Sequence, residues 1–227
     1  MQEILRTGIY SIPEAARLTR VSTWRIRRWL RGYEFKARTG RHSSPPVWEG
    51  QLAPIGHAVA LGFLDLIEVR CVDALLQTGV SWPTLRLAHA HARRMVRHSH
   101  PFCTNQFATD GQTVFLRFRK ETQEETVWDM KAIQRVFEQI IEPFLRNVEF
   151  SERDLASRWW PMGLSHQVVL DPRRALGRPI VAAHGVPTAS LAAAVKADGD
   201  VKRVAEWFSV SSREVEEAVD FEARLAA

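Results

Sequence analysis

The sequence predicts a mainly α-helical protein with a small β component. Apolar residues recur at helical spacing in several segments, and most of these segments follow a Ser or Asp residue that can cap a helix. Short alternating runs that are typical of strands are fewer and lie mostly in the middle of the chain. With 227 residues, of which 45% are hydrophobic and 25% charged, the chain is long enough to bury a real core.

Two short helices are expected near the N-terminus. The first covers residues 13–18, with Ser11 as its N-cap and Pro13 in the first turn, where its missing N–H costs nothing. The second follows the capping residue Ser22 and continues to about Leu30. Helical spacing places the apolar residues of the second helix on one side and its polar and basic residues on the other.

Two helices joined by a tight turn, with arginines facing outward from the second, are what a helix-turn-helix requires. An ordinary helical hairpin with a solvated basic face is the alternative, but the turn, the caps and the charge agree on DNA binding. The residues expected to contact operator DNA from this helix are Thr23, Trp24, Arg25, Arg27, Arg28 and Arg31. Since one helix contacts only a few base pairs, a homodimer on a palindromic operator is expected.

The same stretch resembles the DNA-reading segment of the MerR class of winged regulators. The resemblance rests on the run SIPEAA from residue 11, the pair VS from residue 21 and the run RIRRW from residue 25. The chain departs from the family pattern at Arg20, where glycine is usual, and at Trp29, where tyrosine is common. The resemblance implies base or phosphate contacts by Thr23, Trp24, Arg27 and Arg28.

Residues 34–50 are expected to form a wing beside these helices. They carry Lys36, Arg38 and Arg41, then the stiff Pro45-Pro46 pair, and return through a short apolar strand at Val47-Trp48. Basic side chains on such a loop would lie along the phosphate backbone next to the groove. A surface loop without this role is an equally good interpretation of the segment taken by itself.

The net charge of +5 is unevenly distributed along the chain. Residues 1–50 hold ten Lys and Arg against four acidic residues, a balance of +6, whereas residues 201–227 hold four against six, a balance of −2. Because clustered positive charge favours binding of a polyphosphate, the N-terminal end is the expected nucleic-acid end. The last helix is expected to contact protein, since its acidic residues would repel a phosphate backbone.

Two longer helices are expected over residues 55–77 and 82–98, with Gly79 as a stop and Ser81 as the second N-cap. They are similar to the pair of helices that packs behind the DNA-binding helices in MerR-like domains. Residues 1–104 are therefore expected to form one winged helix-turn-helix domain.

Residues 105–166 are expected to form a small α+β module that connects the domains or dimerises. Its predicted elements are a strand at 113–119, a helix at 130–145 with a broad apolar face, and short strands at 148–150 and 156–160.

Residues 167–227 are expected to form a third domain, with a strand at 167–170 and three helices at 190–197, 201–208 and 212–225. Ser211 and Glu214 are placed as a capping box for the last helix. The pair DP from residue 171, the run GRP from 177 and the run GVP from 185 precede the three helices. This pattern resembles a bacterial domain of homeodomain-like shape that is often found in or beside antitoxins. The whole chain resembles VapB-type antitoxins that carry a MerR-like head.

No metal, cofactor or catalysis is expected. The potential metal ligands that lie close together in sequence are His89, His91, His98, His100 and Cys103. Two of them, His89 and His91, would point about 200° apart on a helix, and closely spaced thiolates are missing. No phosphate-cradling loop or nucleophile elbow occurs. The absence of a long apolar run, and two cysteines without a pairing pattern, favour a cytoplasmic protein that does not enter the membrane.

Two classes of function fit these features. One is an antitoxin that represses its own operon through the head and silences a toxin, most plausibly a PIN-domain ribonuclease, through its C-terminal part. The other is a ligand-responsive transcription regulator with residues 105–227 as its sensor. The resemblance of the C-terminal segment favours the antitoxin.

The antitoxin resemblance also implies how a toxin would be inhibited. Antitoxins of this type insert an arginine into the carboxylate cluster that holds the ribonuclease's metal ion, and a guanidinium can bond two carboxylates at once. The segment best suited to this is residues 173–179, with Gly177 and Pro179 shaping a loop. Its candidate toxin-binding residues are Arg173, Arg174 and Arg178. Solvated arginines, or an Arg178 that braces the loop through a carbonyl, are the alternative.

Overall fold

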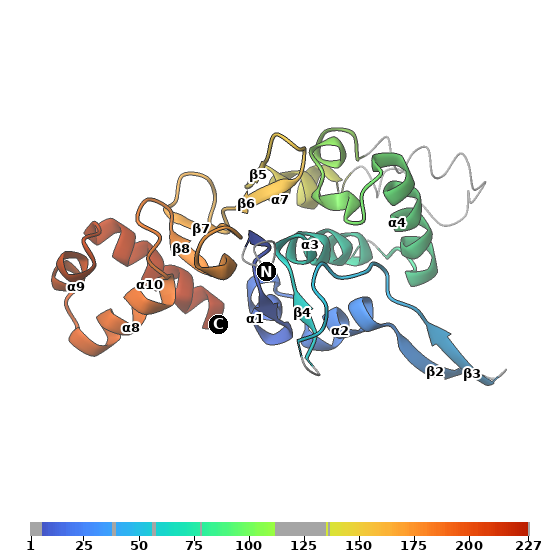
Figure 1. Ribbon diagram of the computed structural model, residues 1–227, viewed down its shortest axis with the longest axis horizontal. Coiled ribbons are helices and arrows are strands. Elements are labelled where there is room, and N and C mark those ends of the chain that lie inside the picture. Colours follow the sequence, from blue (N-terminus) through green and yellow to red (C-terminus); the bar gives the residue numbers. More distant parts are fainter. Residues whose placement is uncertain are drawn as a thin grey trace. The chain divides into compact units, whose positions relative to one another are not determined.

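The structure is a computed structural model that describes residues 6–37, 40–55, 58–77, 79–111, 135 and 137–226. It combines helices with small sheets, and the helices dominate (Figure 1). Contacts divide the chain into two compact units. The head unit comprises Tyr10–Arg146 and Phe150–Ala156, and the tail unit comprises Met1–Ile9, Asn147–Glu149 and Ser157–Ala227.

The head unit is built around helix α3, Phe63–Gln77, which is buried at nearly every position of its first three turns. A helix that is buried all round is the centre of a core rather than one side of it. Strands β1 and β4 pair antiparallel, and so do β2 and β3. The bounds of the elements around α3 are β1 Tyr10–Ser11, α1 Ile12–Thr19, α2 Thr23–Arg31, β2 Tyr33–Ala37, β3 Gly40–Ser44, β4 Ala60–Leu61 and α4 Trp82–Val96.

Four caps predicted from the sequence are present. The side chain of Ser11 accepts the N–H of Glu14, and the Glu14 carboxylate accepts the N–H of Ser11, so α1 begins with a complete capping box. Ser22 caps α2 and Ser81 caps α4 in the same way, because each serine side chain accepts the backbone N–H of the residue three positions later. The capping box of the last helix is also formed, between Ser211 and Glu214.

Helix α3 begins later than the sequence predicted. The expected helix over residues 55–77 starts only at Phe63, because the chain before it forms a bridge between Ile55 and Ala58 and then strand β4. The start of the helix is fixed from elsewhere in the chain: Gln51 Oε1 accepts the N–H of Leu64 at 2.7 Å. The pair Val47-Trp48 is also not a strand.

Part of the predicted central module lies outside the described residues. This applies to the strand at 113–119 and to residues 130–134 of the predicted helix at 130–145. Within the described residues the chain continues through the π-helix η3 Phe137–Ile141 into α7 Glu142–Leu145. Pro143 lies in the first turn of α7 and does not end a helix.

The tail unit places a three-helix group beside a small sheet (Figure 1). The sheet has the order β5-β6-β7-β8, and β7 pairs antiparallel with both β6 and β8. Its strands are β5 Val148–Phe150, β6 Ala156–Trp159, β7 Val168–Leu170 and β8 Pro179–Val181, and its helices are α8 Thr188–Asp198, α9 Val201–Phe208 and α10 Ser212–Ala226.

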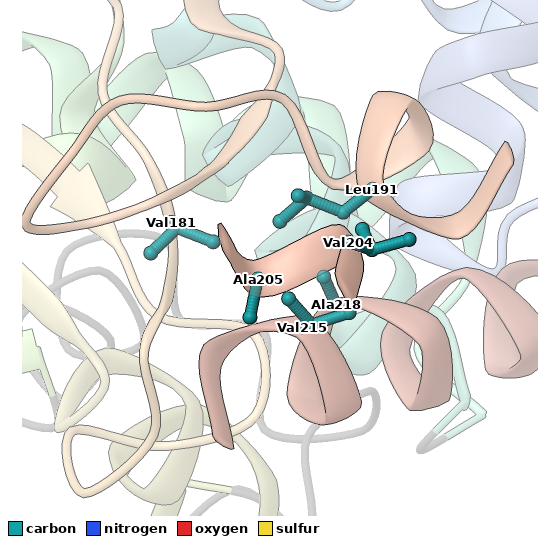
Figure 2. Close-up of a cluster of buried hydrophobic side chains, with 6 residues drawn as sticks. All are labelled: Val181, Leu191, Val204, Ala205, Val215 and Ala218. Carbon is teal, nitrogen blue, oxygen red and sulfur yellow. The ribbon is translucent and has the colours of Figure 1, made fainter. Parts of the chain in front are cut away.

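The core of the tail unit joins one strand to all three helices. Figure 2 shows this cluster, in which β8 supplies one residue and each helix at least one. The members are Val181, Leu191, Val204, Ala205, Val215 and Ala218. Val215 and Phe221 of α10 are buried and Val219 is half-buried.

Helix α8 begins at Thr188 after Pro187, not at Ser190, because Pro187 accepts the N–H of Ser190 and so starts the first turn earlier. Strands β5 and β6 join β7 and β8 in one sheet, and the division of the chain into three domains stays a prediction.

Candidate nucleic-acid interface

Helices α1 and α2 are joined by a turn of three residues that begins with Arg20 in the left-handed conformation, at φ 60°. Glycine adopts this conformation most easily, which explains the glycine that is usual here in MerR-like heads. Two contacts fix the end of α1 before the turn. Thr19 Oγ1 donates to the carbonyl of Ala15 within the helix at 2.6 Å, and Arg70 of α3 donates to the carbonyl of Thr19 at 3.0 Å.

The inner side of α2 fixes the helix in the head. Ile26 is fully buried and Trp29 is 3% exposed. The Trp29 ring stacks on Trp82, the first residue of α4, with the centroids 6.0 Å apart. The carbonyl of Trp29 also accepts the N–H of Val47, which ties the chain after the wing to the end of α2.

The outer side of α2 presents a polar and aromatic surface at its first turns. Thr23 and Arg27 are exposed and lie one turn apart, so their side chains are neighbours. Trp24 is 62% exposed, so its large ring is accessible at the start of α2. Arg31 is exposed on the last turn.

Arg28 is held between two aromatic rings. Its guanidinium carbon lies 4.2 Å from the centroid of Trp24 and 3.2 Å from that of Tyr33. Stacking occupies the faces of the guanidinium but leaves its N–H edge for hydrogen bonds. The three residues therefore form a stacked group that keeps Arg28 in one orientation at the outer surface of α2.

Arg25 has an ion-pair partner within the head unit. Its Nη1 lies 2.7 Å from Oδ1 of Asp73 on α3, and the Asp73 side chain is only 4% exposed. The Arg25 side chain is also within cation–π distance of Trp29, at 5.1 Å. A guanidinium paired with a buried carboxylate joins α2 to α3, so we assign Arg25 a positioning role.

The wing is a regular antiparallel hairpin formed by β2 and β3. Its pairs run from Tyr33 opposite Ser44 to Ala37 opposite Gly40. Lys36 and Arg41 lie opposite each other and both are exposed, while Arg41 is 4.0 Å from the exposed Glu34. The predicted contact Arg38 lies outside the described residues.

A buried carboxylate fixes the segment that follows the wing. Asp65 of α3 is fully buried and accepts Trp48 Nε1 at 2.8 Å and the N–H groups of Gln51 and Gly62 at 3.1 and 2.8 Å. His100 Nε2 lies 2.8 Å from the same carboxylate. These four contacts join three separate chain segments to the first turn of α3.

His100 is expected to make stability depend on pH. Burial lowers its pKa, but the hydrogen bond to Asp65 and the charges of Glu68 and Asp65 outweigh burial, so the pKa is raised from 6.5. A raised pKa in the folded state means that this stabilisation is complete below the unfolded pKa and is lost as pH rises through the folded one. The loss of stability in His100→Asn should therefore be larger at about pH 6 than at about pH 9. Urea unfolding at both pH values measures this, with the exposed His42→Asn as control, and an equal loss at both would contradict it.

The tail places the three predicted toxin-binding arginines differently. Arg174 Nη1 donates to the carbonyl of Ala182 at 2.5 Å and lies against Gly185, so it braces the loop that carries it. This is the bracing role that the sequence suggested for Arg178. Arg173 and Arg178 are exposed.

The loop between these arginines has an uncommon backbone. Ala175, Leu176 and Gly177 all have positive φ, at 46°, 56° and 83°. Two successive non-glycine residues in this region are strained, and such strain occurs often at sites of contact. Leu176 is also 41% exposed.

Comparisons with known proteins extend over nearly the whole chain. A protein of Mycobacterium tuberculosis named "Putative antitoxin VapB45" is 27% identical over 227 residues, covering 93% of this chain and 92% of the relative. This chain resembles VapB45. The crystal structure of Rv2018 from Mycobacterium tuberculosis has the same fold, with a TM-score of 0.72, 24% identity, and 93% of this chain and 96% of that chain covered. No model of a known protein family matches the chain.

Two of the potential metal ligands, His89 and Cys103, have protein partners. His89 Nε2 lies 2.8 Å from Glu68, and Cys103 donates to Glu68 and to the carbonyl of Leu64. Burial raises the pKa values of the Cys71 and Cys103 thiols, which disfavours thiolate ligands. Within the described residues, no group of three His, Cys, Asp or Glu side chains has a metal-binding arrangement. In the same part of the chain, no helix combines the length and apolar character needed to cross a membrane.

The acidic residues of α10 are engaged inside the tail unit more than the sequence suggested. Glu214 caps α10 and contacts His184, Glu217 accepts the N–H of Gln167, and Glu222 accepts the hydroxyl of Thr188. Hydrogen bonds from Ser211 and His184 outweigh burial and lower the pKa of Glu214. Glu216 and Asp220 remain exposed.

Proposed function

We propose that this protein is an antitoxin of a toxin–antitoxin pair, which binds operator DNA through the head unit and its toxin through the tail unit. The observation that carries the proposal is the similarity to VapB45, which spans almost all of both chains. The geometry of α1, α2 and the β2–β3 hairpin supports DNA binding independently of that similarity.

The head is proposed to act as a MerR-like winged helix-turn-helix. The first turns of α2 would enter the major groove, with Thr23 and Trp24 nearest the base edges, while Arg27, Lys36 and Arg41 would lie along phosphates. Arg25 would hold α2 on α3 from inside. A homodimer on a palindromic operator would double these contacts.

The first test of DNA binding removes two arginines of α2. The double variant Arg27→Ala/Arg28→Ala should bind specific and non-specific DNA more weakly, and its salt slope should fall by about 0.9 for each lost phosphate contact. Thr23→Ala should instead change sequence preference, because base contacts carry specificity. Fluorescence anisotropy at several salt concentrations, on an operator selected from random sequence, measures both.

Arg153→Ala is the matched control, because Arg153 is exposed in a head-unit loop far along the chain from α2, and no ion pair holds it within the described residues. If the double variant binds the operator with wild-type affinity and is folded by circular dichroism, α2 is not the DNA-binding helix.

The tail is proposed to hold the toxin through the loop of residues 173–178. The proposed partner is a PIN-domain ribonuclease, whose clustered carboxylates hold a divalent metal that activates water. The exposed guanidinium of Arg173 or Arg178 would bond two of those carboxylates and compete with the metal for their charge. The homeodomain-like helices α8–α10 would support this loop, and Arg174 would maintain its shape from within.

A charge-conserving substitution tests this mechanism. Lysine keeps the positive charge but cannot form bidentate hydrogen bonds. The double variant Arg173→Lys/Arg178→Lys should therefore inhibit a co-expressed PIN-domain toxin about tenfold or more weakly than wild type. Titration of RNA cleavage against antitoxin concentration measures the loss, and Arg153→Lys is the control. Unchanged inhibition by a folded variant would mean that the toxin is blocked sterically or held elsewhere.

A further inference from the structure

Helix α4 carries an unusual concentration of positive charge at its C-terminal end. None of its fifteen residues is acidic. Arg93 and Arg94 lie in its last turn, and Arg97 follows as the left-handed C-cap, at φ 52°. Cations at this end are stabilised by the helix carbonyls, which explains why the fold tolerates three of them together.

These arginines line a cavity of about 530 Å³ in the head unit. Besides Arg93, Arg94 and Arg97, its polar lining includes His89, His98 and Ser99, and Val47 and Ala90 add an apolar portion. The volume is within the range of small-molecule sites, which are about 300–1,000 Å³. We call it the α4 pocket.

The positive charge of the pocket is not balanced by the protein in the part of the chain that the structure describes. No hydrogen bond or ion pair from the side chains of Arg93, Arg94 or Arg97 is found among those residues, and all three are exposed. The three buried carboxylates of the neighbouring helix α3 are already engaged, Glu68 by His89, Asp65 by His100 and Asp73 by Arg25. Among the residues that the structure describes, an anion entering the pocket would therefore meet guanidinium groups that have no carboxylate partner.

The remaining polar groups of the pocket suit the same ligand. Nδ1 of His98 lies 3.1 Å from the backbone nitrogen of His100 and 3.2 Å from its carbonyl oxygen. Both contacts use Nδ1, so Nε2 is the ring nitrogen that can face a ligand. Ser99 adds a hydroxyl, which also lies 3.0 Å from Nδ1 of His100.

We propose that the α4 pocket binds a phosphorylated small molecule with at least two negative charges. Guanidinium groups match the geometry of phosphate oxygens, and three within five residues provide the charge that such a ligand requires. The arginines lie away from the contact of Trp82 with α2. Trp82 begins α4, whereas the arginines come eleven or more residues later, about 17 Å or more along the helix axis. Val47, which also lines the pocket, is hydrogen-bonded to Trp29 of α2, so binding to DNA is measured as well.

This inference does not rest on the antitoxin function, because it concerns the chemistry of the pocket alone. It would give the head a ligand site in addition to its DNA-binding surface. The phosphate groups that these arginines would bind belong either to a free small molecule or to duplex DNA. The free molecule is favoured because the arginines line a cavity. The experiment therefore measures binding of a small phosphate compound and of a DNA duplex.

Isothermal titration calorimetry of the full chain with inorganic pyrophosphate is the direct test. At about 150 mM NaCl, where exposed charges are screened beyond roughly 8 Å, we expect a Kd below about 1 mM. Arg94→Gln should weaken binding about three- to tenfold, and Arg93→Gln/Arg94→Gln/Arg97→Gln should abolish it. Arg153→Gln removes an exposed arginine elsewhere in the head and should leave the affinity unchanged.

A second arm measures binding of the same variants to a duplex of random sequence. The triple variant should keep the wild-type salt slope, whereas Arg27→Gln should lower it by about 0.9. The proposal is overturned if wild-type protein binds no pyrophosphate at about 10 mM, or if the triple variant binds it like wild type. It is also overturned if pyrophosphate fails to bind while the triple variant loses affinity for DNA, because the arginines would then serve the duplex.

Discussion

Replacing Asp65 by alanine is expected to destabilise the head unit by about 3–5 kcal/mol. The carboxylate is fully buried and accepts hydrogen bonds from Trp48, Gln51 and Gly62, in addition to its contact with His100. Without it, several buried donors lose their acceptor at once, and each unsatisfied donor costs about 1–3 kcal/mol. Water entering the space left by the side chain would recover part of that loss.

Urea unfolding at neutral pH, followed by tryptophan fluorescence, measures this loss. Glu34→Ala is the matched control, since it removes an acidic side chain that is 71% exposed on the wing and should change stability by less than about 0.5 kcal/mol. A loss below about 1 kcal/mol in Asp65→Ala would show that the carboxylate is not the group that joins the three segments.

The variant should also reduce DNA binding, although Asp65 lies in the core. The segment from Val47 to Gln51 connects the wing to α3, and Asp65 holds that segment at two points. Releasing it frees the base of the wing. A folded Asp65→Asn protein, in which some acceptors remain, should show a smaller loss of stability and a measurable loss of operator affinity.

Helices α1 and α2 were predictable because their signals are local. Ser11, Glu14 and Ser22 lie within three residues of the backbone groups that they cap, and the apolar spacing of α2 correctly placed Ile26 and Trp29 inside. The capping box of α10 was predictable for the same reason, because Ser211 and Glu214 are three residues apart. Where a residue's partner is a near neighbour, sequence carries most of the information.

The features that the sequence did not reveal concern partners that are distant in sequence. Arg25 of α2 is paired with Asp73 of α3, and the predicted contact of Arg25 with DNA stays a prediction. The start of α3 is fixed by Gln51, which no pattern within the helix could indicate. Arg174 and Arg178 look alike in sequence, and only the position of the Ala182 carbonyl distinguishes the bracing arginine from the exposed one.

Gly32→Ala is the second substitution with a large expected effect. Gly32 connects the end of α2 to the wing, at φ 70° and ψ −171°, a combination that is essentially restricted to glycine. A Cβ at this position would overlap the backbone carbonyl of Ser44, which belongs to the last pair of the hairpin. Backbone cannot move aside as a flexible side chain can.

The expected cost of Gly32→Ala is about 3 kcal/mol, which combines backbone strain with the displacement of β3 from β2. Operator affinity should fall by at least about tenfold, because the basic residues of the hairpin would move relative to α2. Gly79→Ala is the matched control: Gly79 also has a positive φ, of 86°, but a Cβ there would meet open space. It should cost only about 1 kcal/mol and leave DNA binding intact. Equal effects of the two substitutions on stability and DNA affinity would show that the contact between Gly32 and Ser44 does not set the position of the wing.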